Sequence, residues 1–257
     1  MTTVGMGGFG KAKKTYYKGK EAVVKYVNTA GSPQATLATC TINRQDARYE
    51  GEIQKLFDKQ WVAEVYAIEG HAIYMKYYPD GSLRMQIDKG GADKNRYTCA
   101  WDIVKGVKEI HRLDFVHSDI KAANVLVEKG YDVLLCYISD FGGARKRGYW
   151  PIAHTPGFSP ANFFDKALCF EDDIFALGKL FLELFGKFSV YKVGMINYDN
   201  FYEYVDWRTF TNHYNITSDY DDCVKVMHLV HDCINENSSK RPSLDTLESC
   251  FQKIKTD

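Results

Sequence analysis

The segment HSDIKAANVLV, residues 117–127, combines polar side chains suited to chemistry with an apolar run typical of a strand. Asp119 lies two residues after His117, Lys121 follows two residues later, and Asn124 lies five residues after Asp119. A carboxylate can accept a proton, an ammonium can neutralise an anion, and an amide oxygen can bind a metal ion. The segment therefore predicts a loop that handles metal and phosphate, with a polar turn as the alternative.

Another carboxylate follows the next apolar run, VLLCYI. This run leads into SDFG, in which Asp140 lies sixteen residues after Asn124. Carboxylate and amide oxygens at the ends of two neighbouring strands are ligands that suit hard Mg²⁺. Each of these residues alone is a common turn former, but the order and spacing of Asp119, Asn124 and Asp140 together predict a metal and phosphate site.

Residues 5–10, GMGGFG, contain the pattern G-x-G-x-x-G at Gly5, Gly7 and Gly10. A dinucleotide-binding turn needs a strand before this pattern and a helix after it. Here only four residues precede it, and the lysine-rich, non-helical KAKKTYYKGK follows. We predict instead a turn between two strands whose backbone N–H groups cover phosphates, with a plain flexible N-terminus as the alternative.

Lys25 lies inside a predicted strand, AVVKYV at residues 22–27, fifteen residues after the last of these glycines. Its ammonium would lie under the glycine turn and pair with nucleotide phosphates, although a lysine in a strand is commonly just a solvent-facing residue. Such a lysine needs a carboxylate partner, and a predicted helix at 46–57 offers Glu50 and Glu52. We favour Glu50, which lies nearer the apolar face of that helix, and Glu52 remains the rival.

The elements that must position these residues are strands in the first third and helices in the remainder. A second strand is predicted at 72–78, and the helix at 46–57 would place Tyr49, Ile53, Leu56 and Phe57 on one face. After the turn PDGS at 79–82, helices are predicted at 98–112, 173–185 and 222–234, and a last one starts near Ser243. The segment 173–185 is apolar nearly all round, as in a helix buried at a domain centre. This order predicts an α+β protein with a ligand cleft between two lobes.

The composition restricts the class of protein. Lys and Arg together number 33, as do Asp and Glu, so no excess charge indicates nucleic acid or an anionic membrane as a partner. The seven cysteines form no CxxC pair, which favours reduced thiols over disulfides or a zinc site. Neither a signal-peptide apolar region nor a run of ~18 apolar residues is visible. We therefore expect an intracellular protein, in the cytoplasm or the nucleus.

Taken together, GMGGFG, AVVK, HSDIKAAN and SDFG resemble the signature motifs of the protein kinase superfamily, in the same order and with similar spacings. Further along, HTPGFSPAN resembles the end of a kinase activation segment, DDIFALG the start of the large central helix, and KRPS a late arginine motif. The resemblance covers essentially the whole chain. It implies a bilobal kinase fold, with one catalytic domain over residues 1–257, a β-rich N-lobe of residues 1–78 with one helix, and a helical C-lobe of residues 79–257.

The resemblance implies a role for each matching residue in transfer of the γ-phosphate of ATP. Asp119 would accept or orient the proton of the substrate hydroxyl, and Lys121 would neutralise the transferring phosphate. Lys25, paired with Glu50, would position the α- and β-phosphates. Asn124 and Asp140 would bind Mg²⁺ or Mn²⁺. Catalysis would consist mainly of positioning and electrostatic stabilisation.

The resemblance also implies where ATP would bind. The glycine turn above the phosphates would comprise Gly5, Gly7, Gly8, Phe9 and Gly10. Met75 stands at the gatekeeper position, so the backbone of Lys76–Tyr78, the hinge, would meet adenine. His117 and Asp173 would be structural, with Asp173 bracing the catalytic loop.

Two residues depart from the family pattern. Ser118 replaces the arginine that normally pairs with a phosphate on the activation loop, so we expect an activation segment, residues 140–162, that is ordered without phosphorylation. Asn162 replaces a glutamate that normally pairs with an arginine such as Arg241. These departures resemble the casein kinase group, in particular the vaccinia-related kinases. The basic run Arg145–Arg147 predicts a solvated loop, with binding of acidic or phosphorylated substrates as the alternative.

Three functions share these motifs. The first is an active Ser/Thr protein kinase, since Lys121 and Thr155 resemble that type more than the tyrosine-specific enzymes. The second is a pseudokinase scaffold, which would usually lack at least one of the catalytic residues present here. The third is a small-molecule phosphotransferase of the aminoglycoside or choline type, which shares the H-x-D-x-x-x-x-N loop but not the Thr-Pro-Gly segment, Asp173 or Arg241. The protein substrate and the oligomeric state are not indicated by the sequence.

Overall fold

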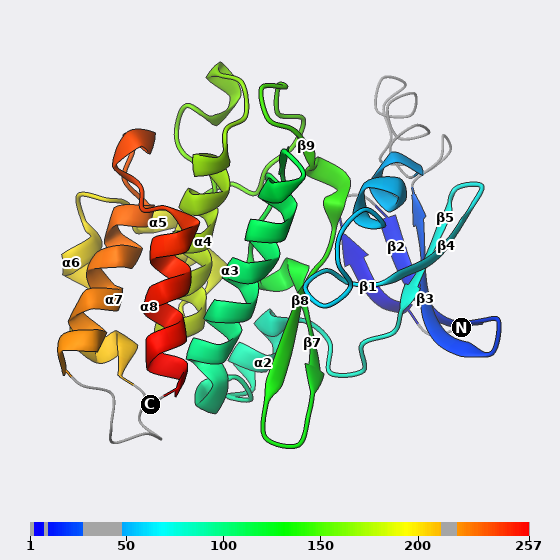
Figure 1. Cartoon of the computed structure of the whole chain (residues 1–257), viewed down its shortest axis with the longest axis horizontal. Helices are drawn as coiled ribbons and strands as arrows, with labels where there is room; N and C mark the ends of the chain where they lie inside the picture. Colours follow the sequence, from blue (N-terminus) through cyan, green and yellow to red (C-terminus); the bar gives the residue numbers. More distant parts are fainter. Residues whose placement is uncertain (1–2, 8–9, 28–47, 212–219, 257) are drawn as a thin grey trace.

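Five antiparallel strands form one sheet in the computed structural model, which describes residues 3–7, 10–27, 48–211 and 220–256 (Figure 1). Burial alternates along the third strand, where Ala22 and Val24 are buried and Val23 is partly covered, as a strand period of two requires. The strands predicted around Lys25 and before the hinge are confirmed. In sheet order they are β1 (Thr3–Gly7), β2 (Gly10–Tyr17), β3 (Lys20–Val27), β5 (Ala72–Lys76) and β4 (Val65–Glu69).

A helix at residues 48–54 packs against this sheet. Gly51 permits the close approach, because a Cβ there would lie 2.9 Å from the side chain of Ile68 in β4. Ile53 and Phe57 are buried as predicted, but Tyr49 and Leu56 are 36% and 56% exposed, so half of the predicted apolar face was wrong. The helix ends before Leu56, which therefore lies in the following turn, and the ring of Tyr49 instead carries the Arg145 guanidinium at 4.7 Å.

The rest of the chain is mainly helical, which confirms the predicted α+β class with a β-rich lobe and a larger helical lobe (Figure 1). The last helix begins after Ser243, as predicted, and the Ser243 hydroxyl accepts a hydrogen bond from Thr246 N at 3.1 Å. None of the helices in the described residues is long and apolar enough to cross a membrane. The helices of this lobe are α2 (Leu83–Asp88), α3 (Arg96–Arg112), α4 (Phe170–Gly186), α5 (Val190–Met195), α6 (Phe201–Tyr204), α7 (Tyr220–Cys233) and α8 (Leu244–Thr256).

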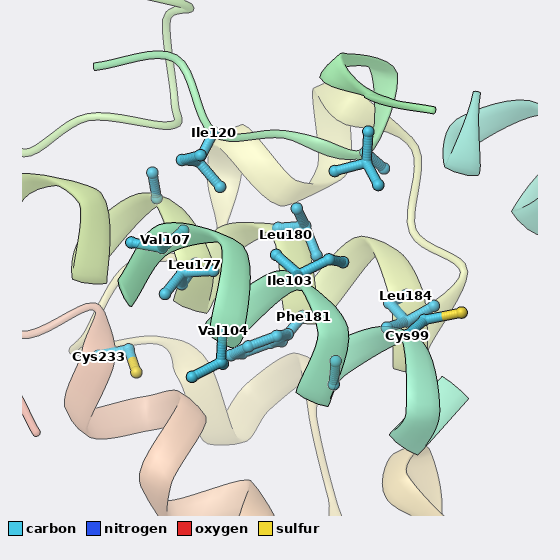
Figure 2. Packing of buried hydrophobic residues seen from close by; sticks show 14 of the residues in the cluster. Cys99, Ile103, Val104, Val107, Ile120, Leu177, Leu180, Phe181, Leu184 and Cys233 are labelled. Carbon is cyan, nitrogen blue, oxygen red and sulfur yellow. The ribbon is translucent and has the colours of Figure 1, made fainter. Parts of the chain in front are cut away.

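The core of the helical lobe is centred on α4. Every residue from Asp172 to Phe185 is buried, which confirms the prediction of a central helix. Figure 2 shows Ile103 and Val107 of α3 close to Leu177 and Leu180 of α4. Such close-packed apolar contacts make the central helix a rigid base for the loops that it touches.

Two small two-stranded sheets connect this core to the polar loops of the sequence motifs. β6 (Phe115–Val116) pairs with β9 (Arg145–Lys146), and β7 (Val125–Lys129) pairs with β8 (Leu134–Ile138). The loop from His117 to Asn124 therefore lies between β6 and β7, and Asp140 follows β8 directly. This topology places the predicted metal and phosphate residues at the ends of neighbouring strands.

Candidate active site

The structure brings the two polar loops into direct contact. Ser139, which precedes Asp140, donates hydrogen bonds to the Asn124 carbonyl oxygen from both its N–H, at 2.8 Å, and its hydroxyl, at 2.9 Å. The His117 ring also lies 3.1 Å from the Ser139 carbonyl oxygen. Asp140 has a left-handed backbone with a φ of 65°, which an aspartate tolerates better than a bulky residue does. The loop that holds Asp119 and the turn that holds Asp140 therefore form one unit.

Lys25 connects the sheet to this unit. Its Nζ lies 2.7 Å from Glu50 Oε1 and 2.7 Å from Asp140 Oδ1. Glu50 is buried, whereas Glu52 is exposed and pairs with Arg48 at 2.7 Å. Of the two carboxylates that the sequence left open, the structure places Glu50 against Lys25.

The charges of this cluster stabilise one another. Burial alone would lower the pKa of Lys25, but the carboxylates of Glu50 and Asp140 outweigh it and hold that pKa above its ordinary value. Burial would likewise raise the pKa of Asp140, and Lys25 more than offsets it, so the pKa of Asp140 is lowered. Lys25 is thus held as a cation and Asp140 as an anion, the forms that would bind phosphates and a metal ion.

The carboxylate of Asp119 lies at the centre of a second group. Lys121 Nζ lies 2.8 Å from Asp119 Oδ2, and the Asn124 amide nitrogen donates to the same oxygen at 2.8 Å. The Thr155 hydroxyl donates to Asp119 Oδ1 at 2.6 Å and accepts a hydrogen bond from Lys121 at 2.5 Å. Thr155 belongs to the activation segment, so this segment is attached directly to the predicted catalytic base.

The donor set of Asn124 and Asp140 fits a hard divalent cation. The Asn124 amide nitrogen donates to the carbonyl oxygen of Asp119 as well as to its carboxylate, so the side-chain bonds described here use nitrogen and leave the amide oxygen for a metal. Asp140 uses one oxygen for Lys25 and has a second to offer. A carboxylate and an amide oxygen are ligands that suit Mg²⁺, with water and substrate phosphates completing the coordination.

Asp173, at the start of α4, holds the backbone of the catalytic loop. Its carboxylate accepts hydrogen bonds from His117 N at 2.8 Å and Ser118 N at 2.9 Å, and lies 2.9 Å from His111 Nε2. Ser118 needs such support, because its φ of 70° is unfavourable for a residue with a side chain. Burial would raise the pKa of Asp173, but His111, His117 and the backbone donors lower it. The structure therefore places Asp173 where the predicted brace would act.

We expect Asp173→Asn to reduce the free energy of unfolding by about 3 kcal/mol, because an amide can accept only one of the two backbone bonds and opposes the other donor. Urea unfolding at neutral pH measures the loss. The matched control is Asp245→Asn, which removes an exposed carboxylate paired with Lys108 and should change stability by less than ~0.5 kcal/mol. Equal values for the two variants would contradict the assigned role.

The glycine turn joins β1 to β2. Gly7 of β1 pairs with Gly10 of β2, and Gly5 pairs with Ala12, so a strand lies on each side of this glycine pattern, as predicted. Gly8 and Phe9 lie outside the described residues. The proximity of this turn to phosphates stays a prediction.

The hinge follows β5. Met75 lies near the helix at 48–54, since Gln54 Nε2 approaches its sulfur at 3.8 Å. Lys76 forms an ion pair with Glu128 of β7 at 2.8 Å, which links the sheet to the helical lobe. The Tyr78 side chain is buried, and its hydroxyl accepts a hydrogen bond from Glu64 N at 3.3 Å. Contact of this backbone with adenine stays a prediction.

The late arginine has partners other than the expected one. Arg241 donates to the carbonyl oxygens of Asn235 and Glu171, each at 2.8 Å, and lies 3.9 Å from the Asp172 carboxylate. Within the described part of the chain, no hydrogen bond or ion pair joins Arg241 to Asn162. Asp172 also pairs with Lys166 at 2.6 Å, so this buried carboxylate at the start of α4 lies between Arg241 and the residues that follow the activation segment.

Comparison with known proteins agrees with this geometry. The family model described as the protein kinase domain matches residues 1–253. A probable L-type lectin-domain containing receptor kinase, S.5, of Arabidopsis thaliana is 27% identical over 283 aligned positions, which cover 95% of this chain and 41% of that protein. A probable serine/threonine-protein kinase of Dictyostelium discoideum is 25% identical over 173 positions, 60% of this chain and 12% of that protein.

A third relative is the eukaryotic translation initiation factor 2-alpha kinase 1 of Plasmodium falciparum, 31% identical over 121 positions. This alignment covers 44% of the chain and 8% of that protein. The chain thus spans less than half the length of each of these relatives.

Proposed function

The chain belongs to the protein kinase family, and we propose that it is an active enzyme that transfers the γ-phosphate of ATP to serine or threonine hydroxyls of proteins. The contact that supports this most directly is the one between Asp119, Lys121 and Thr155, at 2.5–2.8 Å. It assembles a proton acceptor and a cation beside the activation segment. The Lys25–Glu50–Asp140 cluster supplies the second half of the machinery.

In this mechanism each side chain acts on a defined part of the reactants. Asp119 orients the substrate hydroxyl toward the γ-phosphate and accepts its proton, and Lys121 neutralises charge on the transferring group. Lys25 positions the α- and β-phosphates while Glu50 keeps its ammonium in place. Asn124 and Asp140 would hold the divalent ion, which would neutralise phosphate charge when bound. The chain thus contributes orientation and fixed charge more than covalent chemistry.

The two other functions are less well supported. A pseudokinase scaffold would not need the complete ion-pair cluster around Lys25, nor a carboxylate held in place at Asp119. A small-molecule phosphotransferase would not need Thr155 to connect the activation segment to the catalytic loop. These features favour a protein hydroxyl as the acceptor.

The experiment that tests the proposal is transfer of the γ-phosphate of ATP, with Mg²⁺, to casein and to the protein itself, followed by phosphoamino-acid analysis. Phosphoserine or phosphothreonine is the expected product. ATP binding without transfer to any protein would overturn the proposal in favour of the pseudokinase, and transfer only to an aminoglycoside or choline would favour the small-molecule enzyme.

We further propose that the activation segment is competent without phosphorylation. Ser118 lies next to Gly143, since a Cβ on Gly143 would lie 3.7 Å from the Ser118 Cβ. The neighbouring basic residues already have partners, because Arg147 pairs with Asp114 at 3.0 Å and Lys146 donates to the Leu113 carbonyl at 2.8 Å. Thr155 is attached to Asp119 without a phosphate. The segment is therefore ordered by neutral contacts and existing ion pairs.

Treatment with a protein phosphatase is expected not to lower the rate of transfer to casein, because Lys146 and Arg147 already have partners other than a phosphate. Mass spectrometry of Thr155 and Ser159 before and after treatment verifies removal. Ser159→Ala serves as a genetic counterpart and should behave in the same way. A loss of activity on dephosphorylation that returns on rephosphorylation would refute independence from phosphorylation.

Finer assignments are also proposals. Ser118 and Asn162 support membership of the casein kinase group, close to the vaccinia-related kinases. We propose a single catalytic domain over residues 1–257 that divides between residues 78 and 79, the use of Mg²⁺ or Mn²⁺, and a location in the cytoplasm or nucleus.

A further inference from the structure

Lys179 is a buried lysine on the central helix α4. Its side chain is 3% exposed, and its ammonium donates to the carbonyl oxygens of Val193, at 3.2 Å, and Ile196. No carboxylate of the described residues lies within ion-pair distance of it, and Glu236 is the only acidic residue that raises its pKa. Burial therefore lowers the pKa of Lys179 to about 8. A lysine so costly to bury is expected to have a function in this position.

The two carbonyls that Lys179 binds belong to the C-terminal end of α5 (Figure 1). Val193 lies in the last turn of that helix, and Ile196 is its C-cap. A cation is favourable at this end of a helix, where carbonyl groups lack intrahelical partners. At the other end, the Ser189 hydroxyl accepts a hydrogen bond from Lys192 N at 3.3 Å. Lys179 thus fixes the end of α5 to the rigid core.

The same end of α5 touches the activation segment. Gly157 has a φ of +84°, and a Cβ there would lie only 2.6 Å from the Cα of Gly194. Gly157 comes two residues after Thr155, whose hydroxyl contacts Asp119. The position of α5 is therefore connected through one close backbone contact to the site where the substrate hydroxyl reacts.

Apart from Lys192, the exposed side chains of α5 are apolar. Tyr191 is 79% exposed and Met195 is 49% exposed. Lys192, the one cation within α5, lies over the rings of Phe188 and Tyr204 at 5.2 and 4.9 Å. The basic run of the activation segment is likewise engaged in the contacts described above. The surface of α5 beside the reaction site therefore presents mainly apolar side chains to a partner.

We propose that α5 is a docking surface for an apolar segment of the protein substrate, with Lys179 as the residue that positions it. This inference rests on the proposed protein kinase function. We assign the protein substrate as the partner because α5 borders the activation segment at Gly157. A protein kinase must hold its protein substrate beside that segment. Tyr191 would contribute most of the binding, since an exposed tyrosine offers a large apolar area with few rotatable bonds.

A pair of synthetic peptides tests the proposal. Both contain one serine, and one carries leucine and phenylalanine around it where the other carries glutamine. The intact chain is expected to show a kcat/KM at least about tenfold higher for the apolar peptide. Tyr191→Ala and Lys179→Met should each bring this ratio close to one, with the KM for ATP unchanged. A ratio is used because it does not depend on the fraction of active enzyme.

Two controls make the result specific. Tyr131→Ala removes another fully exposed tyrosine, on the β7–β8 turn, and should leave the ratio unchanged. The double variant Lys179→Met/Tyr191→Ala should lose no more selectivity than either single variant, because both act on the same surface. Additive losses, or a ratio of one in the unmodified chain, would overturn the proposal.

Lys179→Met also removes two buried hydrogen bonds, so folding is measured separately. Hydrogen exchange of residues 190–196 should accelerate in Lys179→Met and less in Lys179→Gln, whose amide can still donate. Unchanged exchange in both variants would refute the positioning role. Absence of transfer to either peptide and to casein would mean that the proposed function itself fails, whereas transfer that ignores Tyr191 would refute only the docking surface.

Discussion

Replacement of Asp119 by asparagine is expected to reduce the rate of phosphoryl transfer by roughly 10²–10⁴-fold, the range that general base catalysis contributes. The asparagine side chain has the same shape, but it carries no charge and cannot accept the proton of the substrate hydroxyl. Its amide also has one oxygen where the carboxylate has two, so it can accept from Lys121 or from Thr155 but opposes the other donor with its N–H groups. Binding of ATP should change little, because Asp119 contacts none of the residues assigned to the α- and β-phosphates.

Single-turnover kinetics with labelled ATP separates these effects, because it measures the chemical step apart from product release. The control is Asp245→Asn, which removes an exposed carboxylate paired with Lys108 and should leave the rate unchanged. A rate in Asp119→Asn within about threefold of the unmodified chain would exclude Asp119 as the base.

Replacement of Lys25 by methionine is expected to lower both activity and stability. The ammonium contacts Glu50 and Asp140, and removal of one partner from such a buried network typically costs about 3–5 kcal/mol. The KM for ATP should rise and the rate should fall together, because the α- and β-phosphates lose the cation that positions them. Urea unfolding and steady-state kinetics measure the two effects.

A second substitution separates stability from catalysis. Glu50→Gln added to Lys25→Met removes the buried carboxylate that the first change leaves without its ammonium, so stability should partly recover while activity does not. Recovery of activity in the double variant would show that Lys25 serves the fold and not the reaction. Arg48→Met, which breaks the exposed pair with Glu52, should leave both properties unchanged.

The sequence predicted the fold class, and which polar residues lie close together, because motif order constrains topology. An apolar run before Asp140 and another after Asn124 require two neighbouring strands, and the structure has β7 paired with β8 there. The apolar segment at 173–185 predicted a buried helix for the same reason, since no exposed helix could carry it. A strong apolar pattern depends only on the residues of its own segment, so the element that it predicts is the one that forms in the folded protein.

Contacts between distant segments could not be predicted in this way. No periodic pattern shows that Thr155 reaches Asp119, that Arg145 covers Tyr49, or that Lys179 reaches the end of α5. These contacts depend on how loops are placed by packing elsewhere. The choice between Glu50 and Glu52 was likewise decided by the approach of the helix to the sheet, which Gly51 permits.

The attachment of Thr155 to Asp119 reverses the usual sense of control by phosphorylation. A phosphate on Thr155 would bring about two negative charges to the position where its hydroxyl now donates to a carboxylate at 2.6 Å. Repulsion would separate the activation segment from the catalytic loop and draw Lys121 away to the new anion. A modifying enzyme that reached this residue would therefore act as an off switch, and a phosphatase would restore the enzyme to its working state.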